Sequence, residues 1–394
     1  MTKYFYLVLL LIFMMCISDS AKPQQQDTTK LSIAEVVIIH SQILNEDRKI
    51  YIYSPVNREE LLVQDPMPVL YLMDGEVHTS FVSSEINYLS TVYTVLPKMI
   101  VVGIGNYNYD RFRDLTPVKD PDFPGTPGRP SDNAGGAENF LKFIKEEVMP
   151  YIGSHYRTSP YKIFSGHSLG GLMAIHCLNE HPDMFNAYIA ISPSLWWDKD
   201  YVLKNSYSKL EASSLKNKRL FFSDANEGGH FHQTLLDLEA FLKEKNIPGL
   251  KFKYLSYPEE THGSEPVKAE YDALRFIFSQ SWQPSLADTT AALIKKFYSQ
   301  LSEEYGYTIL PPENIINNMG YTVLSDPSRI SEALELFKFN VENYPESFNV
   351  YDSIGDAYAQ KGDTQNAISN YKKALQINPD SKETIKKLKE INKN

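Results

Sequence analysis

The stretch that most constrains this chain is a short apolar run that ends in a glycine-rich turn. Residues 161–165 have the character of a buried strand, the turn Gly166-His167-Ser168-Leu169-Gly170 follows, and helix-forming residues begin at Leu172. The pattern G-x-S-x-G between a strand and a helix is typical of a sharp bend that presents a serine hydroxyl at its tip. We therefore predict that Ser168 is a nucleophile.

The residues around Ser168 fit this chemistry. A side chain at Gly166 or Gly170 would collide with the neighbouring backbone in so tight a bend. The bend also places the first amides of the next helix, that of Leu169 in particular, where they can donate hydrogen bonds to a developing oxyanion. We expect a second donor after the strand predicted at residues 68–73, from the backbone amide of Gly75 or Glu76.

A serine nucleophile needs a base, and the base is oriented by an acid. His262 lies in the loop after the last predicted strand and is our candidate base. The loop after the preceding strand offers two carboxylates, Asp224 and Glu227. We favour Glu227, because Asp224 lies too close to the end of the strand for its carboxylate to reach the imidazole of His262. Asp224 remains the alternative acid.

Two further histidines, His230 and His232, have the spacing of a metal-binding pair. No second pair of ligands accompanies them in the sequence, and a structural zinc site usually needs four. We therefore expect no metal site, and the proposed chemistry needs no organic cofactor.

Strands and helices alternate through the first two thirds of the chain. Two strands predicted at residues 32–39 and 49–53 form an antiparallel pair. Further strands are predicted at 68–73, 99–103, 161–165, 187–191, 220–223 and 252–257, and helices at 137–149, 169–180, 231–245 and 265–278. This order indicates an α/β fold with a mostly parallel central sheet flanked by helices, in which sites form beyond the carboxyl ends of the strands.

After Trp282 the sequence predicts helices alone. Ala333, Phe337 and Pro345 recur as Ala367, Tyr371 and Pro379, 34 positions later, which is the tetratricopeptide period. We predict two repeats over residues 313–381, a connecting helix within 283–312 and a capping helix at 382–394, since two repeats alone do not bury a stable core. The repeats either pack against the first domain or bind a protein partner, and the sequence favours neither.

The N-terminus predicts export. Lys3 precedes an apolar run at residues 4–17, and small residues follow at 18–20, so we predict a signal peptide at 1–20, a disordered spacer at 21–30 and a catalytic domain at 31–282. The expected location is the periplasm or the cell surface. Cys16 offers a lipoprotein alternative, although the residues before it form a poor lipidation motif.

The remaining composition limits the partners. After cleavage only Cys177 is left, so no intramolecular disulfide is expected. The net charge of −10, without a basic cluster in the body of the chain, argues against nucleic acid. No stretch after the signal approaches about 18 apolar residues, so no stable membrane span is expected.

Several motifs together resemble the putative-esterase family of the α/β-hydrolases, which includes ferri-siderophore trilactone esterases and S-formylglutathione hydrolase. The resemblance covers about residues 32–282. The motifs are Tyr71-Leu72-Met73-Asp74-Gly75, Arg111-Phe112-Arg113-Asp114-Leu115-Thr116-Pro117, Gly166-His167-Ser168-Leu169-Gly170-Gly171, Ser192-Pro193-Ser194-Leu195-Trp196-Trp197-Asp198 and Thr261-His262-Gly263-Ser264. Such a resemblance implies an α/β-hydrolase fold, with Ser168 and His262 catalytic and Glu227 as third member, although some relatives manage with a Ser-His pair. It also implies that Arg111, Arg113, Trp196 and Trp197 line the acyl pocket.

We therefore expect a serine carboxylic-ester hydrolase that acts through a Ser-His-acid triad and an acyl-enzyme on a small-molecule ester. The resemblance implies a siderophore-type, enterobactin-like substrate, since tryptophans stack on aromatic rings and arginines meet anionic groups. Two alternatives stay open. One is a feruloyl or acetyl carbohydrate esterase, and the other is a non-catalytic protein that binds partners through its repeats.

Overall fold

The computed structural model describes residues 32–55, 66–92, 95–106, 110–123, 125–126, 129–279, 282, 284 and 290–392. The predicted signal peptide and spacer lie outside these residues. Within the described ranges, none of the helices has both the length and the apolar character that crossing a membrane requires.

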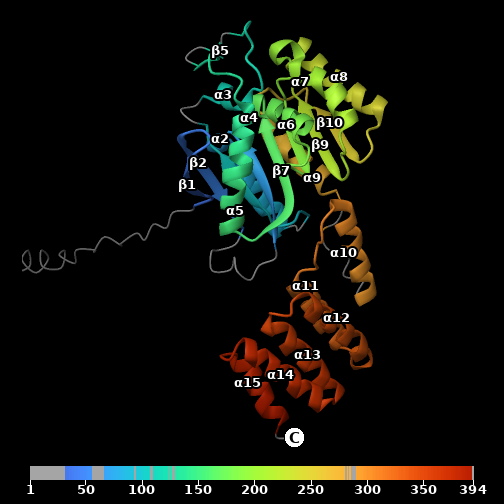
Figure 1. Cartoon of the computed structure of the whole chain (residues 1–394). Coiled ribbons are helices and arrows are strands. Elements are labelled where there is room, and N and C mark those ends of the chain that lie inside the picture. Colours follow the sequence, from blue (N-terminus) through green and yellow to red (C-terminus); the bar gives the residue numbers. More distant parts are fainter. Residues whose placement is uncertain are drawn as a thin grey trace, which may run out of the picture. The chain divides into compact units, whose positions relative to one another are not determined.

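The described residues form a central eight-stranded sheet with the strand order β1-β2-β4-β3-β7-β8-β9-β10 (Figure 1). β2 runs antiparallel to β1 and β4, and all the other neighbours are parallel. The strands are β1 (Glu35–Ser41), β2 (Glu46–Tyr53), β3 (Met67–Met73), β4 (Ile100–Ile104), β7 (Thr158–His167), β8 (Ala187–Ile191), β9 (Lys218–Asp224) and β10 (Leu250–Ser256), with a separate hairpin of β5 (Gly125–Thr126) and β6 (Arg129–Pro130). The predicted mostly parallel sheet is confirmed.

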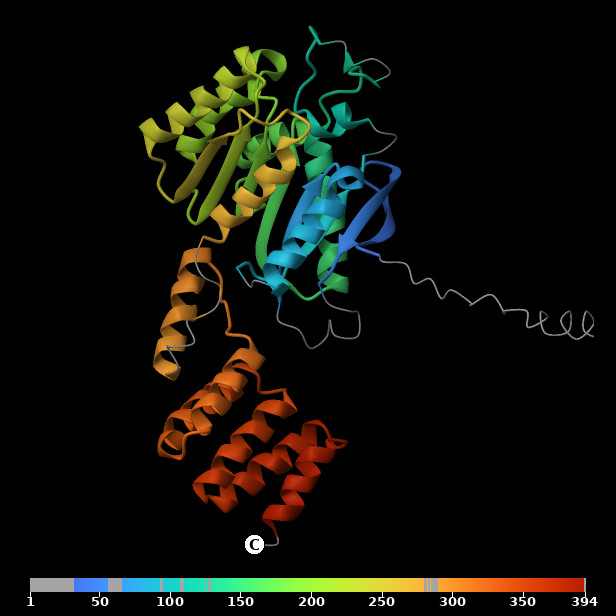
Figure 2. The same cartoon turned by 180° about the vertical axis from the view of Figure 1, so that it is seen from behind.

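Helices cover both faces of the sheet (Figure 2). One face packs against α4 (Ala137–Phe143), η3 (Ile144–Val148), α5 (Met149–His155), α6 (Leu169–Glu180), α7 (Trp197–Ala212) and α8 (Gly229–Lys245). The other packs against α2 (Gly75–Asn87) and α9 (Glu265–Ile277). Short helices α3 (Arg111–Leu115) and η1 (Tyr88–Val92) complete this part.

Strand β3 shows why this arrangement follows from the sequence. All its residues are buried. Tyr71 and Met73 join the core on the α6 face, whereas Leu70 and Leu72 join the core on the α2 face. Successive side chains of a strand point to opposite faces, so a strand covered on both sides must be apolar throughout.

The C-terminal part is a helical array. It comprises α10 (Ala291–Tyr305), α11 (Glu313–Leu324), η4 (Pro327–Arg329), α12 (Ile330–Asn343), α13 (Phe348–Lys361), α14 (Thr364–Ile377) and α15 (Lys382–Ile391). Helices α11 and α12 pack as one pair, and α13 and α14 as the next. The recurring residues explain the pairing: a Cβ atom at Gly320 would lie 2.5 Å from the Phe337 ring, and one at Gly355 would lie 2.6 Å from the Tyr371 ring. Each glycine therefore makes room for the aromatic ring of the partner helix.

Both flanks of the array are covered. At the C-terminal end, the Lys387 ammonium of α15 binds Asp352 at 2.6 Å and Asp356 at 2.8 Å on α13. At the other end, Tyr305 of α10 is fully buried, and its hydroxyl donates to the Ile277 carbonyl at 3.1 Å. The Arg219 guanidinium lies 4.5 Å from the centre of the same ring. Helix α10 is thus packed onto the body that holds the sheet.

Candidate active site

Ser168 lies at the bend between β7 and α6 and has a strained backbone. Its φ of 61° and ψ of −115° fall in a region that residues other than glycine rarely adopt. The Ser168 amide donates to the Ile191 carbonyl at 2.9 Å, which ties the bend to β8. A Cβ atom at Gly166 would lie 2.4 Å from the Gly170 backbone, as predicted, whereas one at Gly170 would meet the Met73 side chain at 3.2 Å and not the backbone. Strain of this kind is maintained where function requires it.

The backbone amides at the starts of α6 and α2 are candidates for an oxyanion hole. Leu169 is the first residue of α6, and the first amides of a helix have no intrahelical acceptor. The end of β3 lies next to the end of β7, and α2 begins there at Gly75. Val77 and His78 already donate to the Asp74 carbonyl, at 2.9 and 3.1 Å, which leaves the amides of Gly75 and Glu76 as the ones without an intrahelical acceptor. Their role as oxyanion donors stays a prediction.

The backbone at Gly75 closely approaches strand β4. A Cβ atom there would lie 2.4 Å from the Gly103 carbonyl carbon of β4. The glycine therefore lets the start of α2 pack on the sheet, and it need not be explained by contact with a substrate.

His262 and Glu227 come together across two loops. His262 Nδ1 lies 2.8 Å from Glu227 Oε1. The Asn226 amide donates to the Glu260 carbonyl at 3.2 Å, which holds the loop after β9 against the loop after β10. Burial alone would raise the pKa of Glu227, but hydrogen bonds from His262 and Ser192 outweigh it and lower that pKa to about 2. Glu227 is therefore ionised at neutral pH beside the imidazole.

Asp224, the alternative acid, has other partners. It is fully buried, accepts a hydrogen bond from the Tyr254 hydroxyl at 2.8 Å, and pairs with Nδ1 of His232. Its side chain thus links β9 to β10 and α8. Of the two carboxylates, only Glu227 is hydrogen-bonded to His262 in the part of the chain that the structure describes.

The base lies against the residue that precedes the nucleophile, and no hydrogen bond joins Ser168 to His262 among the described residues. The His262 ring is 4.4 Å, centre to centre, from the ring of His167, the residue before Ser168. The Ser168 hydroxyl lies 3.4 Å from that of Ser194. Hydrogen bonds of catalytic groups are often long before a substrate binds and shorten in the complex. Burial lowers the pKa of His167 to about 3, so His167 adds no positive charge beside the base.

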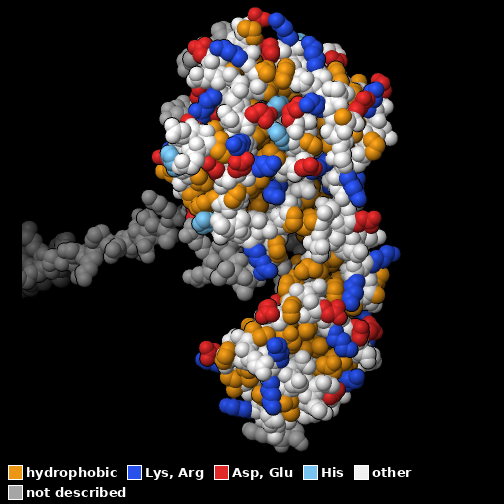
Figure 3. All heavy atoms as spheres, in the orientation of Figure 1, with side chains coloured by type: hydrophobic (Ala, Val, Ile, Leu, Met, Phe, Trp, Pro, Cys, Tyr) orange, Lys and Arg blue, Asp and Glu red, His pale blue; other side chains and the backbone are white. Residues whose placement is uncertain are grey.

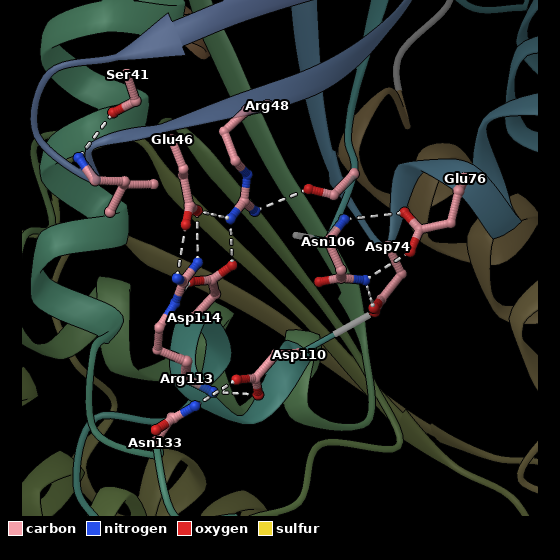
Figure 4. A network of polar contacts seen from close by, with 12 residues as sticks. Ser41, Glu46, Arg48, Asp74, Glu76, Asn106, Asp110, Arg113, Asp114 and Asn133 are labelled. Carbon is pink, nitrogen blue, oxygen red and sulfur yellow. Dashed lines mark hydrogen bonds and ion pairs between the residues drawn. The ribbon is translucent and has the colours of Figure 1, made fainter. Parts of the chain in front are cut away.

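Arg111 is engaged by Asp74. Its guanidinium donates to both carboxylate oxygens, at 2.9 and 2.8 Å, and to the His167 carbonyl at 3.1 Å. Asn106 also binds Asp74, at 2.8 Å, and Glu76, at 2.9 Å, as Figure 4 shows. Arg111 thus fastens the end of β3 to the bend that carries Ser168. With a side chain 23% exposed, its predicted contact with substrate stays a prediction.

Arg113 belongs to a buried ion-pair network, which Figure 4 shows from close by. It donates to Glu46 at 2.8 and 2.6 Å and to Asp114 at 2.8 Å. Arg48, itself fully buried, binds the same two carboxylates at 2.8 and 2.7 Å. The structure gives Arg113 a role in holding α3 to β2, and with a side chain 27% exposed its predicted contact with substrate stays a prediction.

The two tryptophans differ. Trp197 is fully buried, its indole donates to the Val118 carbonyl at 2.8 Å, and its ring stacks on Phe112. The expectation that Trp197 contacts substrate is therefore wrong, because the ring is part of the core. Trp196 is half-buried, with its ring centre 5.6 Å from that of Phe123, and its predicted substrate contact stays open.

Sequence reasoning missed three residues beside the catalytic candidates. The Phe231 ring stands edge-on to His262, with ring centres 5.8 Å apart. The Ser192 hydroxyl contacts Glu227 at 2.6 Å and also contacts Glu265. The only signal in the sequence was that Ser192 opens one of the quoted motifs and that Glu265 follows His262 by three positions.

No group of three or more metal-ligating side chains occurs within the described ranges. His230 pairs with Asp200 at 2.7 Å, and His232 pairs with Asp224. The two histidines thus bind separate carboxylates. Figure 3 shows histidine side chains at the surface, with acidic and hydrophobic side chains beside them.

Comparison with known proteins identifies the family. The model of the family described as "Putative esterase" matches residues 41–245. Ferri-bacillibactin esterase BesA of Bacillus subtilis is 37% identical over 226 residues, which are 53% of this chain and 78% of that protein. The chain belongs to the putative-esterase family. It is accordingly a carboxylic-ester hydrolase.

Solved structures agree with this assignment. An IroE-like serine hydrolase from Shewanella oneidensis has a TM-score of 0.67 and 28% identity, over 78% of this esterase and 99% of that chain. A protein from Capnocytophaga ochracea shares the fold over 92% of this esterase and 100% of its own chain, with a TM-score of 0.59 and 17% identity. A model of the TPR repeat matches residues 355–384, which confirms the predicted repeat character of the C-terminal part.

Proposed function

We propose that this esterase is an exported serine hydrolase in which Ser168, His262 and Glu227 form a catalytic triad that cleaves a siderophore-type ester. The observation that carries the triad is the 2.8 Å contact of His262 Nδ1 with an ionised Glu227, together with the strained backbone of Ser168 at a helix start. Export rests on the N-terminal sequence pattern alone.

Each step of the reaction has a residue for it. Ser168 Oγ attacks the ester carbonyl carbon while His262 Nε2 takes the hydroxyl proton, and Glu227 stabilises the resulting imidazolium. The amide of Leu169 and those at the start of α2 donate to the oxyanion. His262 then gives its proton to the departing alkoxide, which leaves an acyl-enzyme. A water molecule, deprotonated by His262, attacks the acyl carbon and releases the acid and the free Ser168 hydroxyl.

The substrate class rests on relatives and on side chains near the site. BesA is named for a ferri-bacillibactin substrate. The Phe231 ring lies 5.8 Å, centre to centre, from that of His262, so one aromatic surface lies close to the catalytic candidates, and Trp196, two positions after Ser194, is half-buried. Such surfaces stack favourably on catechol rings.

Substitution of the nucleophile tests the triad. Ser168→Ala is expected to abolish hydrolysis of a short p-nitrophenyl ester and labelling by a fluorophosphonate, with an unchanged circular dichroism spectrum. Undiminished turnover by the alanine variant would contradict the proposal. Competition between a ferric catecholate trilactone and a feruloylated oligosaccharide then tests the substrate class, and preferential cleavage of the oligosaccharide would favour a carbohydrate esterase.

Deletion of the repeats tests whether they bind a partner. The cut belongs after Leu310, because Tyr305 packs against the catalytic body and a cut at Trp282 would remove it and uncover the surface it covers. We expect unchanged ester turnover and the loss of any protein retained by the full chain. Retention of the same proteins by the shortened chain would exclude the repeats as their binding site.

A further inference from the structure

Three loops meet behind the triad at one hydroxyl group. Ser192 follows β8, Glu227 follows β9, and Glu265 begins α9 shortly after His262. The Ser192 hydroxyl lies 2.6 Å from Glu227 Oε1 and within hydrogen-bonding distance of Glu265 Oε2. Ser192 and Glu265 are both 0% exposed, so water does not separate these groups.

The number of available protons determines the direction of the hydrogen bonds among Glu265, Ser192 and Glu227. A serine hydroxyl has a single proton and can donate to only one of the two carboxyl groups. The second contact must then be a hydrogen bond that Ser192 Oγ accepts, and a carboxyl group can donate only when it is protonated. One of the two glutamates is therefore a neutral acid.

The contacts show which glutamate is neutral. Glu227 Oε2 accepts from the Ala225 amide at 2.8 Å, and Oε1 lies 2.8 Å from His262 Nδ1 and 2.6 Å from Ser192 Oγ. Both oxygens of Glu227 are thus supplied with donors, as an ionised carboxylate requires. Glu265 Oε1, in contrast, has no hydrogen-bond partner among the described residues. Glu265 thus has fewer hydrogen-bond donors than Glu227, which favours the neutral form of Glu265.

We propose that Glu265 is a positioning residue of the esterase, which in its protonated form donates to Ser192 so that Ser192 donates to Glu227 and fixes it toward His262. The proposal rests on the proposed function, since Glu227 needs fixing only if it orients a catalytic imidazole. The resulting hydrogen-bond chain runs in one direction, from Glu265 through Ser192 to Glu227, and the imidazole binds its far end.

Charges near Glu265 support the neutral form. Burial raises the pKa of Glu265 to about 7, and the negative charges of Glu227 and Asp224 add to the rise. The neighbouring hydroxyls of Ser192 and Ser223 act in the opposite direction. Tyr257, in the loop before α9, also interacts electrostatically with Glu265. Among the described residues, no cation is one of the main groups that shift the pKa of Glu265.

The arrangement predicts a loss of activity at alkaline pH. Once Glu265 ionises, its carboxylate accepts a hydrogen bond from the Ser192 hydroxyl, and Ser192 no longer donates to Glu227. A hydrogen bond to a charged group is then lost beside the catalytic imidazole. We expect kcat/KM of the wild type to fall about tenfold, a typical effect of losing one such bond, with a midpoint near pH 7.

Glu265→Gln is the decisive variant, because its amide donates to Ser192 Oγ at every pH and has the shape of the acid. Measured with a p-nitrophenyl ester from pH 5.5 to 9 and normalised to fluorophosphonate-titrated sites, it should equal the wild type at pH 6 within about threefold and show no alkaline decline. Glu265→Ala, which cannot donate, should be about tenfold slower at every pH. A pH profile of Glu265→Gln identical to that of the wild type would overturn the proposal.

Ser192→Ala gives a second, independent test, since it breaks the chain and leaves Glu265 in place. It should also lack the alkaline decline, at a plateau about tenfold below the wild type. An alkaline decline in kcat/KM that persists in Ser192→Ala would refute the proposal that Glu265 acts on Glu227 through Ser192. If Ser168→Ala keeps its turnover, the proposed function fails. If Ser168→Ala is inactive while Glu265→Gln keeps the wild-type profile, only the present inference fails.

Discussion

Replacing Glu227 by glutamine tests the triad quantitatively. The contacts of Glu227 lower its pKa from an ordinary value of 4.5 to about 2. At 1.36 kcal/mol for each pKa unit, this shift corresponds to about 3.4 kcal/mol of net stabilisation of the carboxylate. The side chain is only 11% exposed, so solvent screens little of this energy.

This energy is a net value after the cost of burial, and the favourable part is shared among His262, Ser192 and the backbone amides of Ala225 and Glu227, so it gives the scale of the effect through His262. About 3.4 kcal/mol corresponds to a factor of about 300 in rate. We predict that Glu227→Gln lowers kcat/KM by about 30-fold to 300-fold, because glutamine keeps the shape but cannot stabilise the imidazolium electrostatically.

The assay is steady-state hydrolysis of a p-nitrophenyl ester at pH 7, normalised to active sites titrated with a fluorophosphonate. Asp224→Asn is the matched control, because Asp224 binds His232 and Tyr254 and not His262. We expect the active-site-normalised rate of this control to stay within about threefold of the wild type. A loss of less than about threefold for Glu227→Gln, or an equal loss for both variants, would refute the reasoning and favour a Ser-His pair.

Further predictions concern stability. Burial raises the pKa of Glu270 to about 8, so between about pH 4.5 and 8 the folded state binds more protons than the unfolded state, and the free energy of unfolding falls as pH rises, by up to about 5 kcal/mol. Glu270→Gln should remove this fall in denaturant titrations at pH 5 and 8, and equal pH dependence in both proteins would contradict it. Tyr305→Ala should lower the free energy of unfolding by about 3–5 kcal/mol, and Tyr305→Phe should lower it by about 1 kcal/mol. A loss below about 1 kcal/mol for the alanine variant would contradict this prediction. Gly355→Ala should lower the unfolding free energy of the array by about 1–3 kcal/mol through overlap with the Tyr371 ring, and an unchanged transition would contradict this.

The sequence predicted the parts of the fold that rest on local patterns. The helix expected at residues 169–180 is α6 (Leu169–Glu180), because a glycine-rich bend marks its start and apolar residues continue through it. The strands of the parallel sheet were recognisable for a similar reason, since burial on both faces requires uninterrupted apolar runs. The repeat period was visible because Ala333, Phe337 and Pro345 recur as Ala367, Tyr371 and Pro379, 34 positions later.

Other elements could not be predicted in this way. Helix α2 (Gly75–Asn87) buries Thr79 and Ser83 beside Val82 and Ile86, and buried small polar side chains do not produce an amphipathic pattern. Helix α7 (Trp197–Ala212) was missed as well, and Asp198 near its start has a left-handed backbone that no propensity indicates.

The sequence predicted those site residues whose positions follow from a local motif or from the order of strands and loops along the chain. Ser168 and His262 follow from a motif and from the loop after the last strand, and the favoured acid, Glu227, is the one that lies against His262. The contact of Ser192 with Glu265 depends on three loops that meet in space, so no spacing in the sequence announces it. The role of Trp197 was misjudged because adjacent tryptophans look alike in sequence, although here one ring is fully buried.

The most direct test of the account is the site and rate of fluorophosphonate labelling, measured by intact-mass and peptide mass spectrometry. We predict a single adduct on Ser168, formed about 100-fold or more faster in the wild type than in His262→Ala. An adduct on Ser194, whose hydroxyl lies 3.4 Å away, or a labelling rate unaffected by the loss of His262, would contradict the assignment of nucleophile and base.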